Sequence, residues 1–354
     1  MNPTRKAGGL KLDNRGRFTL AEINSQPMTW TKILSTIQDQ ISTLETFYRQ
    51  GKYDQLIFTG CGSPYYASLS SASLFRQLSG KMAIALPASE IFHYPENSIL
   101  PARRSLLVVL SRSGATTELI RACESFKANY RGDILTLCCY PGSPLTKQGT
   151  INLTIPEAQE QSLAQTRAFS SLFLITSALV NIWSDRKDLL TSLEGLPLAA
   201  TSILKDYEGL ASNVGWSNQF SRFYLLGSGP RYGLACEISL KLKETSLSHS
   251  EPFHVLEFRH GPKAMVNKET LVLALTRSGE DTLEMSVIND IRQMGAKVIV
   301  SGDKNADVNF NSNLPEAAQH VLHVLFGQLM AYHRSLSCGL NPDLPENLTS
   351  VVLI

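Results

Sequence analysis

Short apolar runs with the character of β-strands alternate along the chain with stretches rich in helix-forming residues. Alternation of this kind predicts parallel sheets with helices on both faces. The longest charge-free apolar stretch, from Ala168 to Ser184, contains several hydroxyl and amide side chains and is short for a membrane span of about 20 residues. It therefore predicts a buried or amphipathic helix. The strand-like runs lie at residues 56–58, 82–86, 106–110, 134–138, 223–226, 271–275 and 297–300.

The same pattern occurs twice. The segment QLIFTGCGSPYYASLSSASLF (55–75) resembles RFYLLGSGPRYGLACEISLKL (222–242), and SLLVVLSRSGATTEL (105–119) resembles TLVLALTRSGEDTLE (270–284). In each copy, an apolar run leads through a Gly-x-Gly turn into a predicted helix. The two matches are separated by nearly the same distance, 167 and 165 positions. The sequence therefore predicts two copies of one α/β domain, with ligands at the carboxyl ends of the strands.

The chain divides around these copies. A length of 354 residues fits two domains of about 100–200 residues each. The arm up to about residue 20 is expected to be mobile, and a helical pattern runs from Phe18 to Glu45. A helical stretch around 202–210 falls in the connection between the copies. The predicted segments are an N-terminal arm and helix (1–45), a first domain (46–184), a connection (185–215), a second domain (216–338) and a C-terminal tail (339–354).

Charge and cysteine content exclude several classes of function. The 33 Lys and Arg residues nearly balance the 31 Asp and Glu residues, and no basic block is present. Binding to nucleic acid or to an anionic membrane therefore has little support. The six cysteines include no CxxC pair and no zinc-ligand spacing, so we expect reduced thiols, no metal site and a cytoplasmic protein. The polar N-terminus has no apolar signal core.

Two turns in the first copy are candidates for anion binding. The Gly60–Ser63 turn places glycine amides at the start of a helix, although glycine turns also serve simply to reverse the chain. It lacks the full dinucleotide fingerprint, so nicotinamide binding is not expected. The segment from Ser111 to Thr117 combines hydroxyls, a glycine and an arginine before a helix predicted at 118–126. We favour a phosphate cradle there over simple helix capping. In the second copy, Glu280 and Asp281 would repel a phosphate.

Carboxylates and histidines in the second copy are weaker candidates by themselves. Glu244 lies between lysines on a helix predicted from Ala235, an arrangement that usually indicates a solvated face. His260, in the turn Arg-His-Gly-Pro, could cap that turn or act as a general acid or base. His320 and His323 lie in an apolar segment and are expected to belong to the core rather than to bind metal.

Taken together, these motifs resemble the double-SIS (sugar isomerase) proteins. The residues that carry the resemblance are GCGSPYYA, SRSGATTE, LAQTRAF (163–169), LKLKETS and EFRHGPKAMV, and the match runs from Glu22 to the end of the chain. The family includes the isomerase half of glucosamine-6-phosphate synthase, aminosugar-phosphate deaminases and fructosamine-phosphate deglycases. The glutaminase domain of the synthase is absent, and the sequence most resembles the glucosamine-6-phosphate deaminases. The resemblance implies an α/β fold of two tandem SIS domains, each a flavodoxin-like parallel sheet flanked by helices.

The resemblance also implies roles for individual residues. Glu244 would move a proton between C1 and C2 of the sugar, and His260 would assist ring opening, reaching into the site of a neighbouring protomer in a homodimer with shared active sites. No cofactor and no metal are implied. The phosphorylated sugar would be held by Gly62, Ser63, Ser111, Arg112, Ser113, Thr116, Ala164, Gln165 and Lys241.

The sequence departs from the family pattern at three positions. Arg112 stands where the synthase has glutamine, which adds a positive charge, and Pro64 stands where it has serine. Many members carry a tail lysine that forms a Schiff base, and here Thr349 or Ser350 occupies that place. We therefore expect a deaminase that converts glucosamine 6-phosphate or galactosamine 6-phosphate to a ketose phosphate and ammonia. The alternatives are an aldose–ketose isomerase, a fructosamine-6-phosphate deglycase, or a non-catalytic sugar-phosphate sensor.

Overall fold

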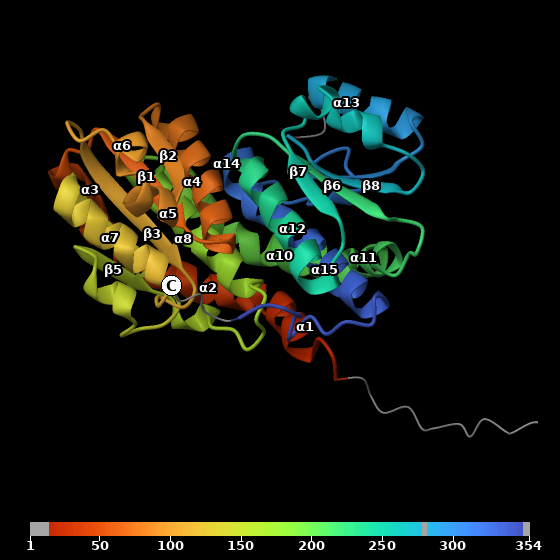
Figure 1. Ribbon diagram of the computed structural model, residues 1–354, viewed down its shortest axis with the longest axis horizontal. Helices are drawn as coiled ribbons and strands as arrows, with labels where there is room; N and C mark the ends of the chain where they lie inside the picture. Colours follow the sequence, from red (N-terminus) through yellow and green to blue (C-terminus); the bar gives the residue numbers. More distant parts are fainter. Residues whose placement is uncertain (1–13, 278–281, 350–354) are drawn as a thin grey trace, which may run out of the picture.

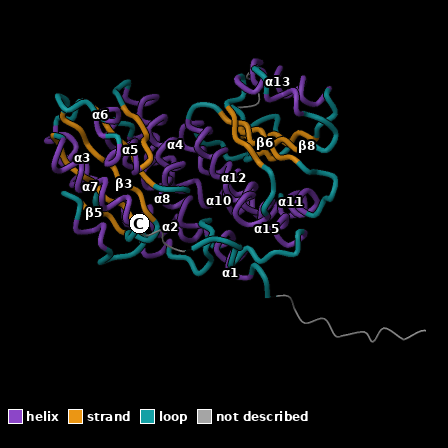
Figure 2. The backbone as a smooth tube through the Cα atoms, in the orientation of Figure 1, coloured by secondary structure: helices purple, strands orange, loops and turns teal. Residues whose placement is uncertain are grey.

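Two five-stranded parallel sheets, each with helices on both faces, make up the computed structural model, which describes residues 14–277 and 282–349 (Figure 1; Figure 2). The strand orders are β2-β1-β3-β4-β5 and β10-β9-β8-β6-β7. Counted within its own half, each sheet has the order 2-1-3-4-5, which is the flavodoxin-like order. The strands are β1 (Gln55–Gly60), β2 (Ala83–Pro87), β3 (Arg104–Ser111), β4 (Arg131–Cys138), β5 (Ile151–Thr154), β6 (Arg222–Gly227), β7 (Ser250–Phe253), β8 (Thr270–Leu275), β9 (Lys297–Gly302) and β10 (Val308–Asn309).

The shared strand order confirms the α/β class and the duplication predicted from the sequence. The central strands β1 and β8 are buried at every position, because helices cover both faces of a parallel sheet. This burial explains why those segments read as continuous apolar runs rather than as alternating ones. The short strands β5, β7 and β10 at or next to the sheet edges lack such runs.

Helices of the two copies pack against each other between the sheets. These are α4 (Ser63–Ser79) and α12 (Pro230–Ser246), which follow the first strand of each copy (Figure 1). Gly233 lies at the contact, where an added Cβ atom would fall 2.3 Å from the Tyr66 carbonyl oxygen. The glycine therefore allows the two helix backbones to approach closely. Behind them, α8 (Arg167–Trp183) and α15 (His323–Ser337) are almost wholly buried, as predicted for the apolar stretch from residue 168.

The first and last described segments of the chain contact each other. The helix α1 (Arg17–Asn24) begins inside the segment expected to be a mobile arm, because Asp343 of the tail holds its first turn. The Asp343 carboxylate accepts hydrogen bonds from the Thr19 backbone N–H (2.8 Å) and from the Phe18 backbone N–H (3.3 Å). The helical pattern that continues to Glu45 forms α2 (Gln26–Gln38) and α3 (Ile41–Gly51).

The predicted connection between the copies is helical. The stretch expected around 202–210 is two helices rather than one, α10 (Leu196–Asp206) and α11 (Glu208–Gly215). No helix of the described residues is long and apolar enough to cross a bilayer. The remaining helices and 3₁₀ turns are α5 (Ala88–His93), α6 (Pro95–Ser98), α7 (Thr117–Asn129), α9 (Lys187–Ser192), α13 (Thr282–Gln293), α14 (Glu316–Gln319), η1 (Pro144–Lys147), η2 (Pro156–Ala158), η3 (Leu193–Gly195), η4 (Glu257–Arg259), η5 (Pro262–Met265) and η6 (His320–Leu322).

Candidate active site

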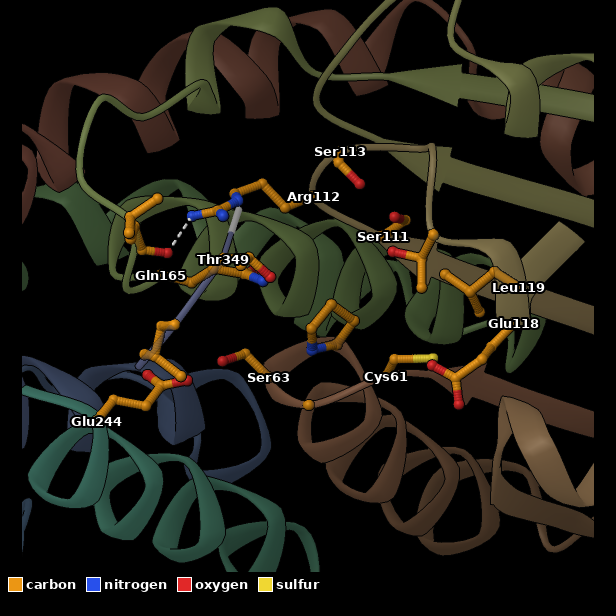
Figure 3. A pocket seen from close by; sticks show the side chains of 15 residues that line it. Cys61, Ser63, Ser111, Arg112, Ser113, Glu118, Leu119, Gln165, Glu244 and Thr349 are labelled. Carbon is orange, nitrogen blue, oxygen red and sulfur yellow. Dashed lines mark hydrogen bonds between the residues drawn. The ribbon is translucent and has the colours of Figure 1, made fainter. Parts of the chain in front are cut away.

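A cavity of about 210 Å³ opens at the carboxyl ends of β1 and β3, where the two anion-binding candidates of the first copy meet (Figure 3). Open parallel sheets bind ligands at this edge. Residues of α12 and of the C-terminal tail complete its wall, so the cavity joins the two copies. It is lined by Cys61, Gly62, Ser63, Pro64, Ser111, Arg112, Ser113, Thr116, Glu118, Leu119, Leu163, Gln165, Glu244, Leu348 and Thr349.

The turn after β1 delivers a serine hydroxyl to the cavity at the start of α4. Gly62 has φ 61° and ψ −128°, a conformation that favours glycine, and this lets the chain turn directly into the helix. Ser63 is the first helical residue, so the free backbone amides of the first turn lie beside it. Its buried hydroxyl oxygen accepts a hydrogen bond of 3.3 Å from the Lys241 ammonium of the other copy.

The loop after β3 is held in place by its own hydroxyls. The Ser111 Oγ accepts a hydrogen bond from the Gly114 backbone N–H (2.9 Å), and the Ser113 Oγ accepts one from Ala115 (3.2 Å). Each hydroxyl keeps its proton for donation to a ligand. Thr116 is the N-terminal cap residue of α7 but makes no side-chain cap hydrogen bond. These features favour the phosphate cradle over the capping interpretation.

The Arg112 side chain is held by contacts with the segment before α8. Its Nη1 donates to the carbonyl oxygens of Leu163 (2.7 Å) and Ser162 (3.3 Å), and it lies 3.6 Å from the Glu160 carboxylate. Glu160 is completely buried, and its Oε1 accepts hydrogen bonds at the start of α8, from the backbone N–H groups of Thr166 and Ala168. The charge of Arg112 at the cavity is therefore partly balanced by Glu160.

A buried carboxylate of α1 positions the segment that Arg112 contacts. The Glu22 carboxylate accepts hydrogen bonds from the backbone N–H groups of Gln161 (2.6 Å) and Ser162 (3.2 Å) and from the Ser162 hydroxyl. Burial, together with the neighbouring charge of Glu160, raises the pKa of Glu22. Helix α1, although outside both sheets, thus supports one wall of the cavity.

Of the two predicted sugar contacts in this segment, one reaches the cavity. Gln165 lines it, and its buried Oε1 has no hydrogen-bond partner among the described residues. Ala164 is buried behind the wall, where its carbonyl oxygen accepts a hydrogen bond from the Ser162 hydroxyl. Leu163, which the sequence reasoning did not single out, lines the cavity next to Gln165.

Three charged residues form a row along α12. The Lys241 Nζ lies 2.5 Å from the Glu244 Oε2 and 3.4 Å from the Glu237 Oε1. Lys241 is only 2% exposed and Glu237 is fully buried, whereas Glu244 reaches the cavity. The solvated-face interpretation is therefore wrong for Lys241, which lies behind the cavity wall and contacts both Glu244 and Ser63.

Burial and pairing shift the pKa values in this row. Burial raises the pKa of Glu237 to about 8, in spite of the opposing effect of Lys241. Burial alone would lower the pKa of Lys241, but the carboxylates of Glu237 and Glu244 outweigh it and the pKa is raised. At neutral pH, Glu237 is therefore mainly neutral, and the charged pair is Lys241 with Glu244.

His260 lies outside the cavity of its own chain. It is exposed at the end of η4, and its turn is held by Arg259, whose Nη2 donates to Ser286 (2.8 Å) and Asp290 (3.0 Å) of α13. The expectation that His260 serves a neighbouring protomer stays a prediction.

The C-terminal tail reaches the cavity without a lysine. Leu348 and Thr349 line it, whereas Ser350 lies outside the described residues. Thr349, one of the two positions aligned with the family's tail lysine, is thus next to the site. Its hydroxyl cannot form an imine with a sugar.

Cys61 and Glu118 are cavity residues that the sequence reasoning missed. Burial, reinforced by the neighbouring Glu118, raises the pKa of the Cys61 thiol to about 12, so it is not a nucleophile at neutral pH. Glu237 was also missed. Its spacing of four and seven residues from Lys241 and Glu244 places all three on one helix face and could have revealed it.

Four further residues of the second copy were considered in the sequence. Glu280 and Asp281 lie outside the described residues. His320 and His323 are buried, as expected of core residues. In the part of the chain that the structure describes, no group of three or more His, Cys, Asp or Glu residues could hold a metal ion.

Comparisons with curated proteins find relatives about twice as long as this chain. It is 28% identical over 347 residues to the glutamine–fructose-6-phosphate aminotransferase (isomerizing) of Methanothermobacter thermautotrophicus, covering 95% of this chain and 57% of that protein. It is 29% identical over 324 residues to the protein of the same name from Salmonella typhimurium, covering 86% of this chain and 52% of that protein. The chain thus spans little more than half the length of these relatives.

Solved structures match over almost the whole chain. The glucosamine-6-phosphate deaminase of Thermotoga maritima is 26% identical with a TM-score of 0.79, covering 95% of this chain and 99% of that one. The tagatose-6-phosphate ketose/aldose isomerase of Escherichia coli is 23% identical with a TM-score of 0.78, covering 97% and 98%. The second match shows the fold alone.

A family model described as the SIS domain matches the chain twice, at residues 51–182 and 218–332. Each match contains one of the two sheets of order 2-1-3-4-5. Sequence family, duplication and strand order therefore agree, and the chain belongs to the SIS domain family, with two tandem copies.

Proposed function

We propose that this chain is a sugar-phosphate isomerase of the SIS type that acts as a deaminase on a 2-amino-2-deoxyhexose 6-phosphate. One observation carries the proposal: a single cavity has hydroxyls and helix-start amides on one side and the Glu244 carboxylate on another (Figure 3). The first group suits a phosphate, and the second suits proton transfer at carbon. A hexose phosphate has the phosphate at one end and its reacting carbons at the other.

The reaction begins with phosphate binding and ring opening. Ser63, Ser111, Ser113 and Thr116 donate hydroxyl protons to the phosphate, and the amides at the start of α4 add to its binding. A histidine protonates the ring oxygen as the ring opens to the aldehyde. We assign this step to His260 of a second protomer, since His260 is exposed and does not line the cavity of its own chain.

Glu244 then moves one proton. Its carboxylate takes the proton from C2 of the open sugar, which gives an enolamine, and returns it to C1, which leaves an iminium at C2. Water adds to C2 and ammonia leaves, so one water is consumed, one ammonia is released and a ketose 6-phosphate remains. Lys241 orients the Glu244 carboxylate through the 2.5 Å ion pair.

The tail supports a deaminase over a synthase. A reaction that adds nitrogen to a ketose gains from a lysine imine, and Thr349 cannot supply one. An aminosugar already carries its own nitrogen, so its release needs no lysine. Gln165 lines the cavity, and its buried side-chain carbonyl oxygen has no hydrogen-bond partner among residues 14–277 and 282–349. This oxygen accepts a hydrogen bond from the substrate's ammonium or hydroxyl group.

The test of this function is the variant Glu244→Gln. With glucosamine 6-phosphate or galactosamine 6-phosphate, the unaltered protein is expected to release ammonia. The variant should lose about 100- to 10,000-fold in kcat, the range for loss of a general base, while substrate affinity stays close to that of the unaltered protein. The matched control is Glu251→Gln, at an exposed position of β7. Full turnover in Glu244→Gln would remove Glu244 from the mechanism, and no ammonia from a protein that binds both sugars would refute the deaminase.

Aldose–ketose isomerisation of a hexose phosphate is the second candidate, because it uses the same Glu244 proton transfer and also needs no tail lysine. Mass spectrometry of the products separates the two reactions: an isomerase gives a ketose without ammonia. The same assay identifies cleavage of a fructosamine 6-phosphate. A sensor without catalytic activity would bind these sugars and leave all of them unchanged.

A further inference from the structure

The second copy contains a cavity of its own, of about 190 Å³, which the proposed reaction does not use. It opens beyond the carboxyl ends of β8 and β9, beside the first turn of α12. This is the same edge of the repeated fold that holds the candidate active site of the first copy, and the two cavities are similar in size. Its lining residues are Arg231, Thr276, Gly302, Asp303, Lys304, Leu314, Glu316, Gln319, His320 and His323.

An ion pair relates the two cavities. In the first copy, Arg112 of the loop after β3 lies 3.6 Å from Glu160. In the second copy, Arg277 of the loop after β8 lies 3.3 Å from Glu316. Glu160 and Glu316 each lie seven residues before the first residue of the following long helix, α8 or α15. The arginine–carboxylate pair is therefore repeated beside the second cavity, where the carboxylate lines the cavity, whereas in the first copy the arginine does.

The second cavity also has buried polar groups with unused hydrogen-bonding capacity. Arg231 is 5% exposed, and its Nη1 contacts Glu316 Oε1 at 2.7 Å, but its Nε has no hydrogen-bond partner among the described residues. His320 is 3% exposed, and its Nε2 likewise has none. Buried polar atoms in native proteins are nearly always hydrogen-bonded, so these two atoms leave hydrogen-bonding capacity that a polar ligand or a water molecule can fill.

The charges around the cavity indicate what that ligand is. Lys304 is exposed at the loop after β9 and, with Arg231, supplies positive charge for an anionic group. Asp303 Oδ1 accepts hydrogen bonds from Ser312, and Gln319 Nε2 donates one to the Leu314 carbonyl oxygen. The other side-chain oxygens of Asp303 and Gln319 can accept hydrogen bonds from hydroxyl groups of a ligand. Glu280 and Asp281, on which the sequence argument against a phosphate in this copy rested, lie outside the described residues.

We propose that this cavity is a second binding site for a hexose phosphate, distinct from the active site and separate from the proposed reaction. Arg231 and Lys304 bind the phosphate, and the carboxylates bind the sugar hydroxyls. Arg231 lies in the first turn of α12, and Glu244 lies in the last turns of the same helix. Occupancy of the second site is therefore expected to change the kcat or KM of the first site through α12.

Equilibrium dialysis of the full chain with glucitol 6-phosphate tests the proposal. This open-chain hexitol phosphate has no carbonyl group and cannot react. The unaltered protein is expected to bind two molecules per chain, and Lys304→Glu should weaken one of the two sites by about tenfold or more, since it reverses a charge beside the phosphate. The matched control is Lys297→Glu, at an exposed position at the opposite end of β9. This variant should keep both binding sites.

Two further variants identify the sites. Arg112→Glu should remove only the active-site molecule, and Arg231→Gln only the second one, with melting temperatures recorded to confirm folding. If Arg231→Gln does not fold, the dialysis result for Lys304→Glu, a change at an exposed position, tests the proposal instead. Inorganic phosphate is tested in parallel: equal affinity for it and for the hexitol phosphate at the second site would show that free phosphate, not a sugar, is the ligand and would overturn the proposal.

One molecule bound per unaltered chain, or two that persist in both Lys304→Glu and Arg231→Gln, would also overturn it. The proposed reaction is tested separately by ammonia release. Binding at two sites without turnover would refute the deaminase alone, and turnover with one site would refute the second site alone.

Discussion

Glu244 faces the cavity, while Lys241 and Glu237, about one and two turns earlier on α12, are shielded from water. A carboxylate that must move a proton benefits from a fixed orientation, and the buried ammonium provides it. A second buried carboxylate would be costly if it were charged, and Glu237 avoids that cost because burial raises its pKa to about 8. The row thus keeps one charged pair at neutral pH.

This pKa makes a prediction for stability against pH. Because the folded pKa of Glu237 lies above its unfolded value near 4.5, the folded state holds the proton more tightly, and stability falls as pH rises from about 4.5 to 8. Glu237→Gln removes this ionisation. Between pH 6 and 8, the free energy of unfolding of the unaltered protein should therefore fall more steeply than that of Glu237→Gln. The difference in slope should be on the order of 1 kcal/mol per pH unit.

Urea unfolding at several pH values measures this difference. Glu251→Gln, on the exposed side of β7, is the control and should keep the slope of the unaltered protein. Equal slopes for the unaltered protein and Glu237→Gln would show that Glu237 is already ionised in the folded state.

At the scale of the elements, the helices α4 and α12 determine how the two copies come together. Each follows the first strand of its copy and starts at a Gly-x-Gly turn, so each begins at the ligand-binding edge of its sheet. Their contact brings Lys241 of one copy to the Ser63 hydroxyl of the other. The candidate active site depends on this contact, because neither copy alone contains both the turns after β1 and β3 and Glu244.

Gly233→Ala tests the contact. Alanine in a helix is ordinarily favoured over glycine by about 1 kcal/mol. Here the new Cβ would lie 2.3 Å from the Tyr66 carbonyl oxygen and 2.4 Å from the Ser70 hydroxyl, so the clash should prevail and destabilise the protein by about 1–3 kcal/mol.

The matched control is Gly209→Ala in α11, where an added Cβ atom meets nothing within 4 Å. That change should be neutral or stabilising in urea unfolding. If both variants were equally stable, the close approach of α4 and α12 would not matter to the fold.

At the scale of the whole molecule, one cavity gathers most of the residues proposed to bind the sugar or act on it. Three of those residues do not line it: Ala164 and Lys241 are buried behind its wall, and His260 is exposed elsewhere on the surface. His260 is exposed and does not line the cavity of its own chain, so it can act on a sugar bound there only if a second copy brings it to the site. A two-fold dimer would do so reciprocally, because each protomer offers the same surface to its partner.

Mixing two inactive variants tests this sharing. In a dimer of one Glu244→Gln chain and one His260→Gln chain, one site carries both changes and the other carries neither. If half of the randomly mixed dimers are of this kind, ammonia release should recover to about one quarter of that of the unaltered protein. Mixing that restores no activity beyond that of the separate variants would show that His260 acts within its own chain or not at all.

The sequence by itself determined the α/β class, the duplication and the two turns that line the cavity, because apolar runs, glycine turns and hydroxyl clusters are local features. It also singled out Glu244, which lines the cavity, through the family resemblance, though not Glu237 or Glu160, whose side chains are completely buried. Only the tertiary structure decided that Lys241 is buried, that Arg112 is bound by Leu163 and Glu160, and that α1 and the tail lie against the site. These features depend on burial by distant elements or on contacts between residues 48 or more positions apart, and no local pattern encodes such contacts.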